Sequence, residues 1–380
     1  MTSPARPTVL FVAVPSALGG SNRALLTLLG ALEGKVNRIV AAPGAGAMAY
    51  TVATEGLAEE YLGLRQSGAV GRFLRFMNAL RIARWARKRR HDLSAIHANA
   101  TTGFYMAAPA ALLTGVPLTV WVHDSVSTPW GKRLGRLMGR RMKWVQWAAV
   151  SSVARDVIVQ NGFANGDHVR IVPNPVSEEV VLATSRKARV DGRVRVGFLG
   201  AATAAKGFDL LPEVMRETSD LLLTWKLFVN RKNLPGEVPI WERIDALEDV
   251  QVEVFGRIHD VRDAYAQCDL IFNPSRFESF SRVTAEALIN AIPVVASDIS
   301  PMRDLLEGTE AGMLFSAADP KAASDAIREL ASQPGELERR AEACVQLDLE
   351  FEPAAVAALM LDLYETAHGS RLPAGHREGG

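Results

Sequence analysis

The chain has 380 residues, which is longer than one ordinary hydrophobic core supports, so we expect two domains. Its composition, 48% hydrophobic and 22% charged, is that of a globular protein, and no apolar run approaches the ~20 residues that a membrane span needs. Cys268 and Cys344 lie far apart, which argues against a disulfide scaffold or a zinc site and fits a reducing compartment.

The net charge of +1 hides two halves of opposite sign. Residues 1–180 contain 21 Lys and Arg against 10 Asp and Glu, whereas the remaining residues contain 22 against 32. Because opposite charges attract different ligands, this asymmetry also indicates two domains with different partners.

Short apolar, β-branched runs alternate with longer helical stretches in the first half of the chain. The first run is too brief for a signal peptide and leads into a glycine turn, so we interpret it as a buried strand. The alternation is typical of βα repeats and of a parallel sheet covered on both faces. The predicted strands are Thr8–Val14, Val36–Ala42, Leu93–His97, Leu118–His123 and Trp147–Val150.

The segment PGAGAMA matches the G-x-G-x-x-A pattern of dinucleotide-binding folds through Gly44, Gly46 and Ala49. It follows the second predicted strand rather than the first, and its acidic partner would have to be Glu60. We therefore interpret the segment as a plain strand-to-helix turn and not as an NAD site.

The same alternation restarts after a proline-containing, charged stretch, with a helical end to the chain. We predict an α/β fold of two doubly wound, Rossmann-like domains, 1–176 and 193–350, joined by a linker at 177–192 and facing a central cleft. A last helix at 351–368 and a disordered tail at 369–380 follow. The predicted elements are strands Val194–Leu199, Leu221–Val229, Val250–Phe255, Leu270–Phe272 and Pro293–Ala296, and helices Pro320–Ser332, Glu336–Leu347 and Pro353–His368.

The segment VGFLGAATAAKG suggests one half of a binding site. A strand ends at Gly200, a loop of small residues follows, and Lys206 and Gly207 are predicted to open a helix. Small residues let the backbone approach a ligand, and a lysine at a helix N-terminus suits a diphosphate. The alternative is an ordinary surface lysine in a βα loop.

The segment NPSRFESFSRVTAEALINAIPVVASD places two carboxylates, Glu278 and Glu286, in apolar surroundings. We predict Glu278 in the loop after a strand and Glu286 on the inner side of a helix that Ser281 caps. Buried carboxylates need donors, and sugar hydroxyls are good donors, while Arg282 and the helix N-terminus suit phosphate. The alternatives are that Glu278 pairs with Arg276 or Arg282 and that Glu286 is solvated.

The first domain contributes histidines and basic stretches. His97 and His123 end predicted strands at the expected cleft, and a following acid favours a functional role for His123. Eight Arg or Lys lie in 72–90 and six in 132–143. Basic amphipathic helices bind anionic lipid, and the alternative is that these helices are simply solvated. We expect no nucleic-acid contact, because no aromatic-basic interleaving is present.

The order and spacing of these motifs resemble glycosyltransferase family 4, whose members are retaining enzymes with the GT-B fold, over nearly the whole chain. The sequence contains the early Gly19-Gly20 loop, a strand-end His-Asp, the Lys-Gly of the phosphate loop and the E-x7-E motif. Leu363 and Tyr364 match the family's last helix, which crosses back to the first domain.

The resemblance implies a role for each matching residue. Glu278 binds hydroxyls of the donor sugar, Glu286 binds the nucleotide ribose, and Lys206 neutralises the diphosphate leaving group. Gly20 lets its loop approach the donor phosphates, and His123, with Lys206 and Glu278 a predicted catalytic residue, contacts the sugar. The other predicted donor-binding residues are Gly200, Thr203, Arg231, Arg276, Ser279, Phe280, Ser281, Arg282 and Val283, and the predicted acceptor-binding residues are Asn22, Arg23, His97, Asn99, His123 and Asp124.

The chain departs from the family at two positions and matches it more weakly at a third, because the acid often found after the proline-valine strand would fall at Asp304. The family often has Arg directly after the glycine that matches Gly200, where this chain has Ala201, and Arg231 and Arg276 are candidates to replace it. A glycine common after E-x-F is Ser281 here.

The resemblance implies transfer of a hexose from a nucleotide-diphosphate sugar to an acceptor hydroxyl, by front-face attack with retention. We expect a role in bacterial polysaccharide, glycolipid or glycoconjugate biosynthesis in the cytoplasm, on a sugar or lipid-linked acceptor, with peripheral contact to anionic membrane. No D-x-D element stands beside the expected nucleotide site, so we expect no metal and no other cofactor. Two rivals stay open: a degenerate nucleotide-sugar-binding or partner protein, and a sugar-nucleotide epimerase or hydrolase.

Overall fold

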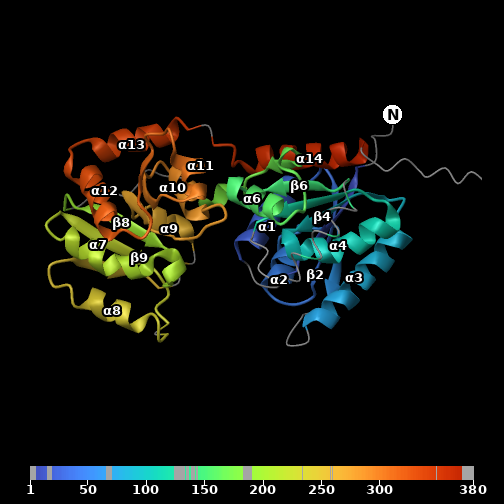
Figure 1. Cartoon of the computed structure of the whole chain (residues 1–380), viewed down its shortest axis with the longest axis horizontal. Coiled ribbons are helices and arrows are strands. Elements are labelled where there is room, and N and C mark those ends of the chain that lie inside the picture. Colours follow the sequence, from blue (N-terminus) through green and yellow to red (C-terminus); the bar gives the residue numbers. More distant parts are fainter. Residues whose placement is uncertain are drawn as a thin grey trace, which may run out of the picture. The chain divides into compact units, whose positions relative to one another are not determined.

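The computed structural model of the chain describes residues 6–14, 19–65, 71–123, 133, 137, 142, 144–182, 191–232, 234–256, 258, 260–347 and 349–369, apart from the side chains of 71, 72, 178 and 367–369. By its contacts the chain divides into two compact units (Figure 1). Unit 1 comprises Met1–Pro175 with Glu350–Gly380, and unit 2 comprises Val176–Leu349. Residues 183–190 of the predicted linker and 370–380 of the predicted tail lie outside the described residues.

The described residues of unit 1 form a seven-stranded parallel sheet in the order β3-β2-β1-β4-β5-β6-β7. The inner strands are almost wholly buried on both faces, which is why they read as continuous apolar runs in the sequence. The strand bounds are β1 (Thr8–Val12), β2 (Asn37–Pro43), β3 (Glu60–Leu64), β4 (Leu93–Asn99), β5 (Leu118–Val122), β6 (Gln146–Ala149) and β7 (Val169–Ile171).

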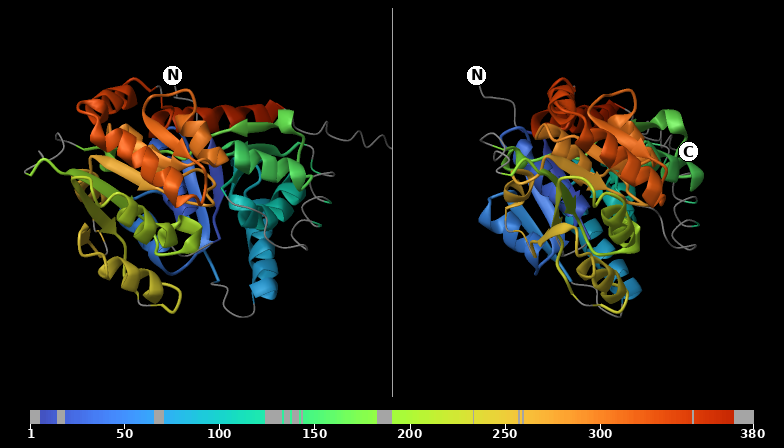
Figure 2. Two further views of the ribbon diagram at one scale, coloured as in Figure 1. Left: turned by 60° about the vertical axis from the view of Figure 1, so that its left-hand side comes forward. Right: turned by 90° about the vertical axis from the view of Figure 1, so that its left-hand side faces the viewer.

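Helices cover both faces of this sheet. α4 packs on β1, β4 and β5 and against α3, whereas α14 packs on β4 and β5 and against α1. Because crossovers are right-handed, connections that run in opposite directions place their helices on opposite faces. The last helix, red in Figures 1 and 2, therefore completes the α1 face of unit 1. The helix bounds are α1 (Gly20–Ala31), α2 (Ala47–Thr54), α3 (Gly71–Lys88), α4 (Ala100–Thr114), α6 (Ser152–Gln160) and α14 (Pro353–Gly369).

The described residues of unit 2 form a six-stranded parallel sheet in the order β10-β9-β8-β11-β12-β13. Its strands are β8 (Val194–Leu199), β9 (Leu223–Phe228), β10 (Gln251–Val254), β11 (Leu270–Asn273), β12 (Val294–Ser297) and β13 (Gly312–Phe315). Its helices are α7 (Leu211–Glu217), α8 (Val238–Asp245), α9 (Val261–Tyr265), α10 (Arg282–Ile289), α11 (Ser300–Leu306), α12 (Pro320–Ser332) and α13 (Glu336–Val345).

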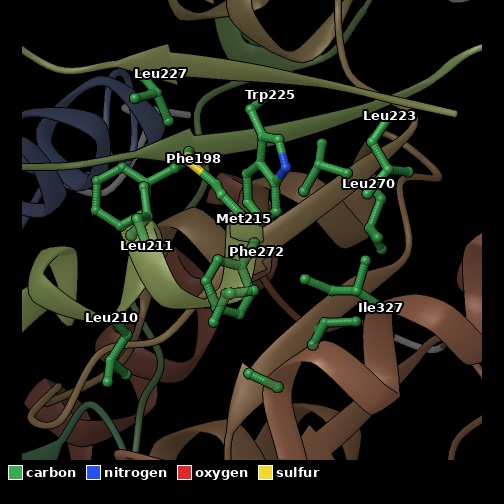
Figure 3. Close-up of a cluster of buried hydrophobic side chains, with 14 of the residues drawn as sticks. Phe198, Leu210, Leu211, Met215, Leu223, Trp225, Leu227, Leu270, Phe272 and Ile327 are labelled. Atoms are coloured by element: carbon green, nitrogen blue, oxygen red, sulfur yellow. The ribbon is translucent and has the colours of Figure 1, made fainter. Parts of the chain in front are cut away.

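A cluster of large buried side chains of unit 2 lies between this sheet and its helices, among them α7 and α12. Figure 3 shows Trp225 of β9 and Phe272 of β11 beside Met215 of α7 and Ile327 of α12. The rings of Trp225 and Phe272 meet edge to face with their centroids 5.8 Å apart, a geometry that aromatic pairs prefer. This core fixes the strands β8 and β11, whose carboxyl ends carry the predicted donor residues.

The predicted fold class of two doubly wound α/β units is confirmed, and every predicted strand has a counterpart within a few residues. Within PGAGAMA, residues 44–46 form the turn between β2 and α2, as predicted, and both cysteines are buried and form no disulfide. Several strand ends differ from the predicted ones by one or two residues; β4, for example, continues past His97 to Asn99. Three strands were not predicted: β3, β7 and β13.

Candidate active site

Each sheet has one position where two neighbouring strands send their connections in opposite directions. These positions are β1/β4 in unit 1 and β8/β11 in unit 2. In open α/β sheets, ligands bind outside the carboxyl ends of the strands at such a position. The predicted site residues form two clusters, one at each of these positions.

The loop after β8 does not open an α-helix at Lys206, which corrects the prediction. Ala204–Lys206 form a short 3-10 turn, Gly207 takes a left-handed conformation with φ 68°, and α7 begins only at Leu211. The backbone N–H groups of Lys206 and Gly207 donate to carbonyls within the turn. Lys206 therefore offers its charge at this strand end, but not the open amides of a helix N-terminus.

Two contacts hold this loop against the loop after β11. A Cβ atom at Gly207 would stand 2.1 Å from the carbonyl oxygen of Pro274, so only glycine permits this approach. The Arg276 guanidinium binds both carboxylate oxygens of Asp209, at 2.6 and 2.8 Å, and also donates to the Ala204 carbonyl at 2.6 Å. Arg276, predicted to bind the donor, thus joins the two loops in this structure.

The joined loops bring Lys206 to Glu278. Lys206 Nζ lies 2.5 Å from Glu278 Oε1, and the two side chains are 35% and 14% exposed. The Ser275 hydroxyl lies 3.0 Å from the same oxygen and 2.8 Å from Asn273 Oδ1, and its one hydrogen serves either acceptor. The partner of Glu278 is therefore Lys206, not Arg276 or Arg282.

Ser281 precedes α10 but does not cap it with its side chain, which corrects the predicted cap. Its hydroxyl instead meets Asn273 Nδ2 at 3.0 Å and Thr284 Oγ1 at 2.9 Å. The residue adopts φ 64°, in the left-handed region that favours glycine. Glycine adopts this angle without strain, whereas a serine here is strained. The first turn of α10 has no side-chain cap.

Glu286 lies inside unit 2, and its side chain is only 8% exposed, so the solvated alternative is wrong. Tyr265 donates its hydroxyl hydrogen to Oε2 at 2.8 Å, and Arg282 donates to Oε1 at 2.7 Å. Burial raises the pKa of Tyr265 well above its usual value, and the Glu286 charge raises it further, so the phenol keeps its proton. Tyr265 and Arg282 together fix the orientation of the carboxylate.

Other predicted donor residues lie around this cluster in different states. The Arg231 guanidinium stacks 4.7 Å from the centre of the Trp241 ring and binds Asp245 at 2.8 Å. Thr203 is exposed at the start of the 3-10 turn, and Gly200 directly follows β8. Phe280 is buried, whereas Ser279 and Val283 are partly exposed.

The β1/β4 position of unit 1 holds a buried polar network. Asn99 Nδ2 donates to the Ser21 carbonyl at 3.2 Å and lies 3.4 Å from Asn22 Oδ1. This orients Asn99 Oδ1 toward His123 Nε2 at 3.0 Å. Because the Ser21 carbonyl only accepts, the amide has one orientation, and His123 must carry its hydrogen on Nε2.

Burial keeps both histidines of this region neutral. It lowers the pKa of His123 to about 3, against a smaller opposing effect of Asn174. It likewise lowers the pKa of His97 to about 3, and His123 lowers it further. His97 is wholly buried, 2.9 Å from the Tyr364 hydroxyl of α14. The position of His97 is that of a core residue and does not support the predicted contact with an acceptor.

The other predicted residues of unit 1 differ in access. Asn22 and Asn99 are buried, whereas Gly20 and Arg23 are exposed at the start of α1. Asp124 lies outside the described residues. Asn22 and Asn99 therefore act on a ligand only through the groups that they hold.

Several residues of the site carried no signal in the sequence. Asp209 and Tyr265 are 67 and 21 residues from their partners Arg276 and Glu286, too far for a local pattern. Asn273 and Ser275 had a weak signal, because polar residues directly after a buried strand of a parallel sheet often face a ligand.

Two absences concern the described part of the chain alone. There, no three or more His, Cys, Asp or Glu residues come together in a group able to hold a metal ion. None of the described helices is long and apolar enough to cross a bilayer.

Comparison with known proteins gives matches in both units. Residues 18–180 match the family model described as Glycosyltransferase Family 4, and residues 193–333 match the one described as Glycosyl transferases group 1. Both models thus include the clusters at the β1/β4 and β8/β11 positions.

Two mycobacterial proteins are similar in sequence. A phosphatidyl-myo-inositol mannosyltransferase of Mycobacterium leprae is 29% identical over 262 residues, which are 66% of this chain and 64% of that protein. A GDP-mannose-dependent alpha-mannosyltransferase of Mycobacterium tuberculosis is 25% identical over 201 residues, which are 53% of this chain and 49% of that protein. The chain therefore spans less than two thirds of the length of either relative.

Among solved structures, the Anabaena protein HepE in complex with UDP and glucose has a TM-score of 0.76. It is 17% identical in sequence, and the match covers 95% of this chain and 100% of that one. At this identity the likeness is one of fold.

Proposed function

The chain belongs to glycosyltransferase family 4 and has the α/β units of the GT-B fold, and from this we propose that it is a retaining glycosyltransferase. It moves a hexose from a nucleoside-diphosphate sugar to an acceptor hydroxyl. The observation that carries the proposal is the ion pair of Lys206 and Glu278 at the carboxyl ends of β8 and β11, with Glu286 on the helix that follows.

Lys206 is the proposed electrostatic catalyst. As the bond to the sugar breaks, negative charge grows on the departing diphosphate, and a cation already in place there lowers the barrier. The ammonium of Lys206 must exchange Glu278 for phosphate oxygens when the donor binds. That exchange frees the Glu278 carboxylate to accept hydrogen bonds from the sugar hydroxyls.

Glu286 is the proposed ribose ligand. Each of its oxygens already accepts one hydrogen bond and keeps a second lone pair for a ribose hydroxyl. The first turn of α10 has no side-chain cap, and its N–H groups suit a phosphate. With these groups and Lys206 at the leaving group, we propose that the reaction needs no metal ion.

Unit 1 is the proposed acceptor domain. Arg23 is exposed at the start of α1 and suits direct contact, whereas Asn22 and Asn99 hold His123 in one tautomer. We propose that the acceptor hydroxyl attacks from the side of the leaving group and that the departing phosphate takes its proton. This route retains the anomeric configuration without an enzyme nucleophile.

The proposed setting is polysaccharide, glycolipid or glycoconjugate biosynthesis in the cytoplasm of a bacterium, with peripheral contact to the inner membrane face. One observation supports it: the similar Mycobacterium leprae protein is named a phosphatidyl-myo-inositol mannosyltransferase. HepE, which was solved with UDP and glucose, supports only the nucleoside-diphosphate donor. The base and sugar of the donor depend on pocket shape, so they must be measured.

A thermal-shift screen of the full chain against UDP-, GDP- and ADP-sugars identifies the donor. We then expect slow hydrolysis of that donor without acceptor, unchanged by 5 mM EDTA, and release of the sugar with the anomeric configuration of the donor by NMR. Release of the inverted anomer would disprove retention, and loss of turnover in EDTA that Mg²⁺ restores would disprove metal independence.

One observation favours a second candidate, a degenerate protein that binds nucleotide sugar without turnover. Ala201 stands where the family often has Arg, and both candidate replacements are engaged elsewhere, Arg231 by Asp245 and Arg276 by Asp209. Binding of a donor in the thermal-shift screen with no hydrolysis and no transfer would establish this candidate. Interconversion of the sugar itself would instead indicate the epimerase.

A further inference from the structure

Helix α3 of unit 1 is apolar on two opposite faces. One face packs toward the body of the unit with buried residues that include Ile82 and Ala86. The other face points to solvent, although it carries large apolar side chains at the helical spacing i, i+3, i+4, i+7. These are Phe73, Phe76, Met77 and Leu80, exposed to 63%, 60%, 40% and 41%.

Single exposed apolar residues are normal on a protein surface, but a row of four on one helix face marks an interaction site. None of the residues 73–77 is buried, so the first turns of α3 stand clear of the unit beneath them. Figure 2 shows the N-terminal half of this helix projecting from unit 1, beyond α4.

Cations surround and continue this row. α3 contains six Arg or Lys and no Asp or Glu. Arg84 and Arg87 lie on the same face one and two turns after Leu80, and Arg81 and Lys88 are exposed beside it. In the described part of the chain, no carboxylate forms an ion pair with any of these four side chains. We call the four apolar residues and these four cations the α3 face.

We propose that the α3 face docks on an anionic lipid bilayer. Its apolar row enters the boundary between headgroups and acyl chains, and the arginines and the lysine reach the lipid phosphates. Apolar burial and attraction to anionic headgroups act on the same helix, so their contributions to the binding free energy add. This assigns the sequence-level hypothesis of membrane contact to one defined surface.

The charges also argue against a second copy as the occupant. A two-fold interface would place the α3 face of one copy against the same face of the other, with four cations on each side and no acid on either helix. An anionic surface relieves that repulsion, whereas a second copy increases it. The proposal is independent of the sugar-transfer reaction and tests separately from it.

The experiment is sedimentation of the full chain with vesicles of phosphatidylcholine and phosphatidylglycerol in a 7:3 ratio, and with vesicles of phosphatidylcholine alone. We expect binding to the anionic vesicles at low salt and a loss of binding at high salt. Phe73→Ser with Phe76→Ser lowers the partition coefficient at least tenfold. Arg84→Glu with Arg87→Glu lowers it by a similar factor.

Matched variants control for exposure and charge. Leu222→Ser and Val345→Ser remove exposed apolar side chains from unit 2, and Lys35→Glu reverses an exposed cation elsewhere in unit 1. These variants leave the partition coefficient unchanged. All α3 variants keep the wild-type thermal midpoint and the wild-type rate of donor hydrolysis. Vesicle sedimentation does not require sugar transfer, so a failure of the proposed function would not change the measured partition coefficients.

Three outcomes would overturn the proposal. The first is absence of wild-type binding to the anionic vesicles. The second is equal loss of binding in the α3 variants and in the matched variants. The third is evidence for another partner of the α3 face. Such evidence would be a dimer that dissociates only in the Phe73→Ser, Phe76→Ser variant, or salt-sensitive binding of single-stranded DNA in place of vesicles.

Discussion

Lys206 Nζ lies 2.5 Å from Glu278 Oε1, although 72 residues of chain separate them. The proposed leaving-group cation and the proposed sugar ligand therefore neutralise each other until a donor arrives. A diphosphate competes with Glu278 for Lys206, and a sugar competes with Lys206 for Glu278. A bound nucleotide sugar therefore separates the ion pair, because its diphosphate binds Lys206 while its sugar binds Glu278.

This pairing predicts effects of opposite sign for one substitution. Glu278→Gln removes the competitor for Lys206, so a nucleoside diphosphate without sugar binds more tightly than to the wild type. The same variant loses the sugar ligand, so donor hydrolysis falls by about 10²-fold. Lys206→Met weakens binding of the diphosphate and lowers turnover by about 10²–10³-fold. Calorimetry with UDP, GDP and ADP, and hydrolysis rates, measure both effects.

The control for these variants is a second lysine–glutamate pair in the same unit. Lys226 Nζ lies 2.8 Å from Glu253 Oε2, between β9 and β10. Glu253→Gln leaves diphosphate binding and turnover unchanged. Weaker diphosphate binding by Glu278→Gln would contradict the proposed competition. Because both ion pairs are partly exposed, each substitution should change the unfolding free energy of the protein by at most ~1 kcal/mol.

A comparison of Gly207 with Gly192 distinguishes the stability cost of backbone strain from the cost of a close contact. Both have left-handed φ angles, 68° and 72°, but a Cβ would meet the Pro274 carbonyl at Gly207 and nothing at Gly192. Gly192→Ala costs the left-handed strain alone, ~1–2 kcal/mol in urea unfolding. Gly207→Ala costs ~1–3 kcal/mol more. It also displaces Lys206, so hydrolysis falls by about 10²-fold. Equal effects of the two substitutions would rule out the loop contact.

Ser281 lets the cost of its backbone angle be measured. Ser281→Ala and Ser281→Gly both lose the hydroxyl contacts with Asn273 and Thr284, but only glycine relieves φ 64°. The glycine variant should therefore be more stable than the alanine variant by ~1 kcal/mol in urea unfolding. Ala318→Gly relieves a similar angle, φ 63°, outside the site and should raise the unfolding free energy by a similar amount. A less stable glycine variant would show that the angle carries no strain.

The buried histidines predict a pH dependence of stability. With pKa values of about 3 in the folded state and ~6.5 when unfolded, the unfolded chain binds more protons between these values. Stability is therefore full above pH 6.5 and falls as the pH drops toward 3. Between pH 7.0 and 5.5 each histidine accounts for a loss of ~1.2 kcal/mol in urea unfolding.

His97→Gln should remove about half of that loss. His91→Gln, at an exposed position, leaves the pH dependence unchanged. A slope in His97→Gln as steep as in the wild type would place the titration elsewhere.

The orientation of Asn99 predicts the tautomer of His123. Nitrogen-detected NMR of the labelled protein should show hydrogen on Nε2 and a bare Nδ1, from pH 8 to pH 5.5. Asn99→Asp puts a carboxylate beside the ring, so the pKa of His123 rises and the ring takes up a second proton in that range. Hydrogen on Nδ1 in the wild type would reverse the assigned orientation.

How far the sequence predicted the fold depended on burial. Inner strands are covered on both faces, and their continuous apolar runs were found. The strands missed, β3, β7 and β13, all lie at sheet edges, where short, half-exposed segments such as Val169–Ile171 show no such run. An apolar run in the sequence indicates a buried strand. Because an edge strand is less buried, its sequence lacks such a run.

The candidate site shows the same division. The spacing of Glu278 and Glu286 and the Lys206-Gly207 pair were visible because they stand in short motifs. The partners that orient them, Tyr265 and Asp209, come from distant segments and appear only with the three-dimensional contacts. The helix predicted at Lys206 failed because a left-handed glycine interrupts the turn there.

Helix α14 makes the first unit discontinuous along the chain. Tyr364 covers His97, yet unit 2 is translated in full between these two residues. On the ribosome, unit 2 emerges as one contiguous piece and is free to fold at once. Unit 1, although begun first, waits with one side of β4 and β5 bare until the final helix is made. The nascent chain therefore finishes its domains in the reverse of the order in which it starts them.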